Sequence, residues 1–265
     1  MESLRERMAR PLYNRILKQW VGRGELEYEI YLKTDTLLAL QYPPEQLVLP
    51  EELMFQIVHQ AQELWLKLLC EEGIALCEDL DRDDLWKASG RIERMIRIQQ
   101  TLAHEMRVLS TLTPQEFQII RRSLGTGSGQ ESPGFNRLTS VLADGMEETL
   151  QRLCTRRGLT LADVYGEPTP APDLLRICEQ LVDLDQAFQE WLLDHFLLVR
   201  RTIGVDRSVQ ALDGFPTHAL LTRALQPLIR SLWEVRIEMT KRWAPGGGYP
   251  VGADRTKPPA AAPEQ

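Results

Sequence analysis

Hydrophobic residues recur at alternating steps of three and four along most of this chain. One long example runs through residues 173 to 204, and another runs through residues 85 to 109. This spacing places apolar side chains on one face of a helix, whereas a half-buried strand would alternate at every second residue. We find no convincing alternation of that kind, so the pattern predicts an all-α helical bundle. The first stripe comprises Leu174, Ile177, Leu181, Leu184, Phe188, Trp191, His195, Leu198 and Thr202, and the second comprises Ile92, Met95, Ile96, Gln99, Leu102, Met106 and Leu109.

Signals at helix starts support this prediction. Thr113 is followed by Pro114 and then by Glu116, three residues after Thr113, which together predict a capping box. Pro50 and Glu51 likewise open a helix that continues through residue 69. Further helices are predicted over residues 11–21, 28–41, 145–157 and 227–236. We expect a helical extension over residues 1–24, one all-α domain over residues 25–243, and a disordered Gly/Pro/Ala-rich tail over residues 244–265.

Charge and composition narrow the choice of partners and location. The formal net charge is -7 and the pI is about 5.3, which argues against nucleic acid or an anionic membrane surface as a partner. The first residues lack the apolar core of a signal peptide, and no run reaches the length of a membrane span. We therefore expect a cytoplasmic protein, in which the four cysteines are free thiols in the core.

The four histidines do not follow the usual protein metal motifs. His59, His104, His195 and His218 include no His-x-x-x-His pair, and a Glu-x-x-His repeat is also missing. His195, however, occupies a position in the apolar stripe that large hydrophobic residues otherwise fill. Burial there is costly unless the ring nitrogens find partners, which are either a backbone or carboxylate acceptor or an iron atom.

His59 lies on a predicted helical face with Phe55 and Glu63. A buried histidine that bonds neighbours such as Glu63 is the ordinary explanation. The wider motif, Phe55-x-x-x-His59-Gln60-x-x-Glu63-Leu64-Trp65-x-Lys67, resembles the signature helix of the tryptophan 2,3-dioxygenase family of heme proteins. Three further segments resemble that family: Tyr28-x-x-Tyr31-Leu32, Thr113-Pro114-x-x-Phe117-x-x-x-Arg121, and Trp191-x-x-x-His195 with Arg201 and Gly204.

The resemblance implies an all-α fold around a heme pocket and assigns a role to each matching residue. His195 would be the axial ligand of heme b iron, and Ser128 and Met106 would line the heme. His59 would be the catalytic residue that accepts a hydrogen bond from the indole nitrogen. The substrate would also contact Phe55, Phe117 and Arg121, whose guanidinium binds the carboxylate, and Tyr28, Tyr31 and Leu32 from a neighbouring subunit of a homotetramer.

Two segments depart from the family pattern. In Ser128-Gly129-Gln130-Glu131-Ser132, the residues Gln130 and Glu131 stand where the family has an aromatic residue and a glutamine. Residues 205–218 replace the family's Gly-Thr-Gly-Gly loop, whose threonine contacts the amino-acid end of the substrate. Thr217 is a candidate to replace that threonine.

The resemblance implies an oxidoreductase that uses dioxygen to cleave the indole ring of L-tryptophan, or of a substituted tryptophan, giving N-formylkynurenine or an analogue. The departures leave monooxygenation of a tryptophan derivative in natural-product biosynthesis open as an alternative. A protein that binds heme or an aromatic metabolite without turnover, or a plain helical oligomer with structural histidines, also remains open.

Overall fold

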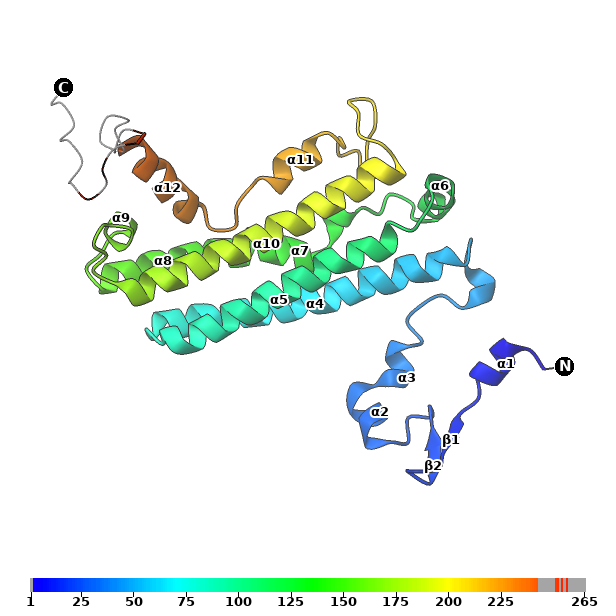
Figure 1. Cartoon of the computed structure of the whole chain (residues 1–265). Helices are drawn as coiled ribbons and strands as arrows, with labels where there is room; N and C mark the ends of the chain where they lie inside the picture. The colour runs from blue at the N-terminus through cyan, green and yellow to red at the C-terminus, as the bar shows by residue number, and fades with distance from the viewer. Residues whose placement is uncertain (1, 243–250, 253, 255, 257–265) are drawn as a thin grey trace. The chain divides into compact units, whose positions relative to one another are not determined.

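The computed structural model describes residues 2–242, 251, 252, 254 and 256, and divides into two compact units. The first unit is Met1–Ile57 and the second is Val58–Gln265. Figure 1 shows the elements of both along the chain. The predicted tail, residues 244–265, lies almost entirely outside the described residues, so the structure leaves that prediction open.

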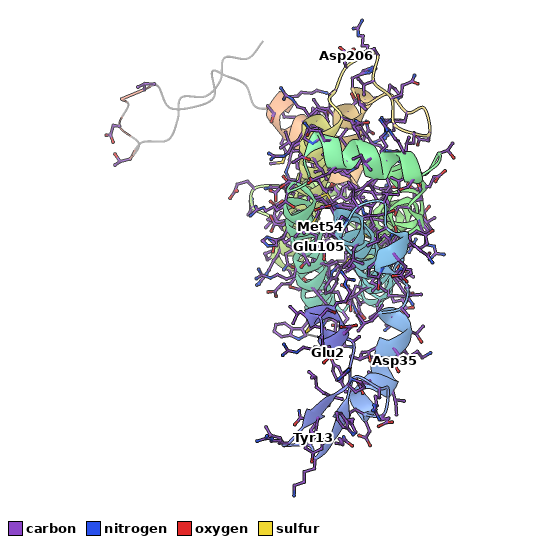
Figure 2. The ribbon with its side chains drawn as sticks, turned by 90° about the vertical axis from the view of Figure 1, so that its right-hand side faces the viewer. Glu2, Tyr13, Asp35, Met54, Glu105 and Asp206 are labelled. Carbon is purple, nitrogen blue, oxygen red and sulfur yellow. The ribbon has the colours of Figure 1, made fainter. Side chains whose placement is uncertain are left out.

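The N-terminal unit consists of short elements. They are α1 (Leu4–Met8), β1 (Leu12–Asn14), β2 (Gln19–Val21), α2 (Glu27–Leu32), α3 (Thr34–Leu37) and the 3-10 turn η1 (Pro44–Gln46). The strands β1 and β2 pair antiparallel, with Tyr13 opposite Trp20, and Figure 2 labels Tyr13 on this hairpin. The helix predicted over residues 28–41 is interrupted at Lys33, which has a left-handed φ of 54°.

The helix predicted over residues 11–21 is wrong, because this segment forms the hairpin. The side-chain oxygen of Asn14 accepts hydrogen bonds from the backbone N–H groups of Ile16 at 3.0 Å and Leu17 at 3.1 Å. Asparagine commonly forms turns in this way. Lys18 then adopts a φ of 53°, which returns the chain toward β2. Local turn chemistry therefore outweighs a weak amphipathic pattern.

Long helices dominate the rest of the molecule (Figure 1). They are α4 (Glu51–Asp81), α5 (Leu85–Leu109), α8 (Ala143–Arg156) and α10 (Pro172–Thr202). Polar contacts join α4 to α5: Arg91 bonds Asp79 at 2.5 Å and Glu72 at 3.2 Å, and the indole N–H of Trp65 donates to Glu105 at 3.1 Å. The helix predicted over residues 85–109 is confirmed.

Shorter helices connect these long ones. They are α6 (Pro114–Ser123), η2 (Gly129–Glu131), α7 (Pro133–Arg137), the π-helical turn η3 (Leu138–Leu142), α9 (Leu161–Val164), α11 (Ala219–Ala224) and α12 (Arg230–Arg242). The capping box of Thr113 and Glu116 is confirmed at the start of α6. Because β1–β2 is the only sheet in the part of the chain that the structure describes, the all-α prediction is also confirmed.

The core is built on the predicted stripes of α5 and α10, which pack against each other. From Leu174 to Trp191 the stripe of α10 is buried. On α5, Ile98 is buried where the prediction named Ile96. Cys154 and Cys178 lie in the core, Cys70 and Cys77 are partly exposed, and none of the four forms a disulfide. No helix within the described residues has both the length and the apolar character needed to cross a bilayer.

A buried carboxylate fixes the segment that leads into α12. Asp185 of α10 is 1% exposed and accepts hydrogen bonds from the backbone N–H groups of Leu228 at 3.0 Å and Ile229 at 3.1 Å. It also accepts one from the indole N–H of Trp233 at 2.9 Å. These bonds satisfy donors that would otherwise be buried without partners.

Candidate functional site

His195 lies where the buried stripe of α10 becomes partly accessible. Trp191, one turn earlier, is buried, whereas His195 and Leu198 are partly exposed. Packed protein atoms around the imidazole and, to a smaller extent, the charge of His59 together lower the pKa of His195 to about 4. The ring is therefore neutral near pH 7, which leaves one nitrogen lone pair available to a ligand.

His59 lies on α4 and interacts electrostatically with His195. His59 is exposed. The alternative in which His59 is a buried structural histidine bonded to Glu63 is therefore wrong in its burial. Glu63, one turn further along α4, uses both carboxylate oxygens for other contacts: it accepts bonds from the hydroxyl of Ser132 and from the backbone N–H of Gly134, the latter at 3.1 Å. The imidazoles of His59 on α4 and His195 on α10 are thus close enough for the charge of one to affect the pKa of the other.

The segment from Ser128 to Phe135 is attached to α4 through Glu63. Ser128, predicted to line a cofactor, is partly buried and its hydroxyl accepts the N–H of Gln130 at 3.3 Å, which caps η2. Gly134 approaches α4 so closely that an added Cβ would lie 2.6 Å from the Cβ of Leu66. A side chain at this position would therefore displace the segment from the helix.

The same segment reaches α10 through an aromatic cluster. The ring of Phe135 stacks on Phe188 at 6.4 Å and meets the edge of Trp191 at 6.0 Å. Such arrangements are favourable for aromatic pairs. Because Trp191 is one turn before His195 and Glu63 is one turn after His59, residues 128–135 bridge the helices of the two histidines.

Phe117 and Arg121 are both partly buried on α6. The guanidinium of Arg121 donates from Nη2 to the backbone oxygen of Gln210 at 2.8 Å. Gln210 belongs to the loop that follows α10 and carries Asp206 (Figure 2). Within that loop Thr217 is fully buried, and its hydroxyl donates to the carbonyl of Val209 at 3.1 Å. The hydroxyl proton of Thr217 is therefore used to brace the loop.

Met106 is buried on α5 and borders a pocket of about 310 Å³. The pocket lies between α5 and α10, beside the sequence neighbours of His195. Its lining residues are Met106, Arg107, Ser110, Asp194, Leu197, Leu198 and Arg201.

The remaining predicted contacts lie in the N-terminal unit. Phe55 is one turn before His59 on α4 and is partly buried. Tyr28, Tyr31 and Leu32 are 69%, 85% and 43% exposed, respectively.

Arg223 of α11 is a candidate site residue that no pattern in the sequence predicts. Its Nη1 donates to the side-chain oxygen of Gln130, and its guanidinium lies 5.0 Å from the ring centroid of Phe135. A lone arginine in a short helix gives no periodic signal. The one signal in the sequence lies at its partner Gln130, where the chain departs from the family pattern.

Comparison with known proteins identifies related sequences. Residues 17–153 match the family model described as tryptophan 2,3-dioxygenase. A tryptophan 2,3-dioxygenase of Herpetosiphon aurantiacus is 30% identical over 259 residues, which cover 81% of this chain and 98% of that protein. The tryptophan 2,3-dioxygenase of Saccharopolyspora erythraea is 31% identical over 281 residues, covering 87% of this chain and 98% of that protein. As its histidine and arginine motifs predict, the chain belongs to the tryptophan 2,3-dioxygenase family of oxidoreductases.

Proposed function

We propose that this protein is a heme-dependent dioxygenase that cleaves the 2,3 bond of the indole ring of L-tryptophan, giving N-formylkynurenine. The observation that carries this proposal is the neutral imidazole of His195, partly accessible at the end of a buried apolar seam and electrostatically coupled to His59. Membership in the tryptophan 2,3-dioxygenase family supports the same reaction.

The donor set at His195 fits heme b. Within the described residues no group of three or more histidine, cysteine, aspartate or glutamate side chains is arranged to hold a bare metal ion. A single neutral imidazole suits a porphyrin iron, because the porphyrin supplies the four equatorial ligands. The apolar residues of the seam around His195 provide the low-polarity environment that axial ligands of heme commonly have. Ser128 and Met106 are proposed to line this cofactor.

When bound, the heme iron supplies the activation of dioxygen, and the protein binds and orients the substrate. We assign to His59 the acceptance of a hydrogen bond from the indole N–H, because a neutral imidazole nitrogen can accept it near physiological pH. Phe55 and Phe117 would enclose the aromatic ring. These apolar contacts would also exclude water from the ring that reacts.

Arg121 is proposed to bind the substrate carboxylate. Its guanidinium has five N–H donors, and the bond to the Gln210 carbonyl uses one of them. The planar fork can therefore pair with both oxygens of a carboxylate while it remains attached to the loop after α10. This arrangement would couple the position of the loop to the presence of the amino-acid group.

We also propose a homotetramer in which Tyr28, Tyr31 and Leu32 contact the substrate of a neighbouring subunit. Support comes from the exposure of these side chains, which leaves them available to contact another chain. The cytoplasmic location stays a prediction.

An absorption spectrum tests the cofactor. Hemin added to the protein is expected to give a Soret band that shifts on reduction, and His195→Ala is expected to lose it. The matched control is His104→Ala, which changes an exposed histidine on α5. Wild-type protein that does not respond to hemin would contradict the proposal.

Mass analysis of aerobic incubations tests the reaction. L-tryptophan is expected to gain two oxygen atoms, and His59→Ala is expected to lower the rate. Gln130 favours one second candidate, a tryptophan with a polar ring substituent, because it places a polar side chain where the family has an aromatic residue. Hydroxylated tryptophans therefore belong in the same assay, with methylated tryptophans as the apolar comparison. A gain of one oxygen would indicate a monooxygenase, and binding without any gain would indicate a non-catalytic heme or metabolite binder.

A further inference from the structure

Two partly buried arginines form no ion pair with any carboxylate in the part of the chain that the structure describes. Among the residues that the structure describes, five arginines are partly buried rather than exposed: Arg91, Arg121, Arg157, Arg223 and Arg236. Three of them form ion pairs: Arg91 with Asp79 and Glu72, Arg157 with Asp83 and Asp173, and Arg236 with Glu179. Arg121 and Arg223 instead donate to neutral oxygens, from Gln210 and Gln130. A guanidinium that is partly removed from water without a counter-ion is suited to an anionic ligand.

The surroundings of Arg223 hold its guanidinium in a fixed place. One face lies over the ring of Phe135 at 5.0 Å, an attractive cation–π arrangement that leaves the N–H groups at the edge free to donate. The side-chain amide oxygen of Gln130 accepts one of these N–H groups. The backbone oxygen of Gln130 in turn accepts a bond from Asn136 at 2.8 Å. The acceptor of Arg223 is therefore held by its own segment.

This arrangement belongs to the same region as the two histidines. Phe135, under the guanidinium, contacts Trp191, one turn before His195 on α10. Ser132 and Gly134, on either side of Pro133, bond Glu63, one turn after His59 on α4. A carboxylate bound between the histidine helices would therefore lie close to a positive charge that forms no ion pair within residues 2–242.

We propose that Arg223 binds a carboxylate in this site, with Gln130 as its neutral acceptor in the absence of ligand. The inference rests on the proposed function, which supplies two carboxylate sources: a heme propionate and the amino-acid group of tryptophan. In either case the guanidinium donates two N–H groups to the carboxylate oxygens. The carboxylate replaces the weaker bond to a neutral amide with an ion pair in which donor and acceptor are both charged.

Hemin titration, followed by Soret absorbance, tests the propionate source. Arg223→Gln is expected to weaken hemin binding by about tenfold, the loss typical of one charge-assisted hydrogen bond. Iron protoporphyrin dimethyl ester, which has no free carboxylates, is expected to bind wild-type protein and Arg223→Gln equally. The control is Arg230→Gln, an exposed arginine at the start of α12, which should leave both affinities unchanged.

Gln130→Glu provides a second variant that keeps the shape of the site. The new carboxylate accepts the same bond from Arg223 and pairs with it permanently, so it competes with any carboxylate ligand. We expect Gln130→Glu to reproduce the loss of affinity seen in Arg223→Gln, with the aromatic contacts of the site retained. This variant tests the inference even where Arg223→Gln fails to fold.

Substrate binding to the hemin-loaded protein tests the other source. If the ligand is the amino-acid carboxylate, both variants bind hemin normally, weaken L-tryptophan about tenfold, and leave tryptamine, which lacks the carboxylate, unchanged. Wild-type affinities of both variants for hemin and for L-tryptophan would overturn the role of Arg223 and leave the dioxygenase proposal intact. Wild-type protein that binds neither hemin nor tryptophan would overturn both.

Discussion

Each of the two compact units of the molecule is stabilised internally by a different kind of interaction. In the described part of the N-terminal unit, residues 2–57, the only buried side chains are the carboxylates of Glu29 and Glu52. Glu29 accepts the backbone N–H of Gly22 at 2.5 Å, and Glu52 accepts that of Val48 at 2.7 Å. The helical unit instead buries apolar stripes from several long helices. Hydrogen bonds shape the first unit, whereas hydrophobic burial stabilises the second.

This difference indicates where stability and assembly reside. Most folding free energy comes from buried apolar surface, so the helical unit carries the stability of the chain. The N-terminal unit exposes much of its apolar surface, including Ile16 at 91% and Tyr31 at 85%. Such a unit is suited to contact another subunit. Substitutions in each unit test this difference.

Asp185→Ala is expected to have the largest effect. It leaves the backbone donors of Leu228 and Ile229 and the indole of Trp233 without their acceptor. We expect the free energy of unfolding to fall by about 3–5 kcal/mol, as for other buried polar networks that lose one member. Urea unfolding followed by circular dichroism measures it. Asp183→Ala on the same helix is the control, and equal losses in both variants would contradict the role of Asp185.

Leu69→Ala tests the apolar core of α4. Leu69 is fully buried, and its truncation is expected to lower the free energy of unfolding by about 2–4 kcal/mol, through lost burial and the cavity left behind. Leu64→Ala, on the same helix but 54% exposed, should change it by less than about 0.5 kcal/mol. The same urea titration compares the two. A loss at Leu64 as large as that at Leu69 would show that α4 is not packed as described.

Tyr31→Ser is expected to have the smallest effect on unfolding, within about 0.5 kcal/mol at concentrations where the chain is dissociated, because its side chain is 85% exposed. The proposed tetramer should nevertheless dissociate more readily, since the variant removes apolar contact surface. Light scattering coupled to size-exclusion chromatography measures the mass at several concentrations. Glu27→Ser, at an exposed polar position of the same helix, is the control. An unchanged mass in Tyr31→Ser would contradict the proposed contact.

Much of the helical unit could be predicted from the sequence, because helix formation depends on local spacing. The stripe of α10 and the capping box at Thr113 are examples. The hairpin at residues 12–21 could not, since a single asparagine side chain decides it. Arg223 could not be identified either, because its contacts with Gln130 and Phe135 join segments that are far apart in sequence. Only the folded chain brings them together.

The close approach of Gly134 to α4 has a consequence for how this site can diversify. Ser132 and Gly134 are anchored to Glu63, and these contacts with α4 involve neither the side chain of Gln130 nor that of Glu131. Mutations at those two positions can therefore alter the chemistry offered to a ligand while the attachment of Ser132 and Gly134 to α4 is retained. Two side chains at the tip of this segment can thus change while the glutamate, serine and glycine that tether it to the helix are kept.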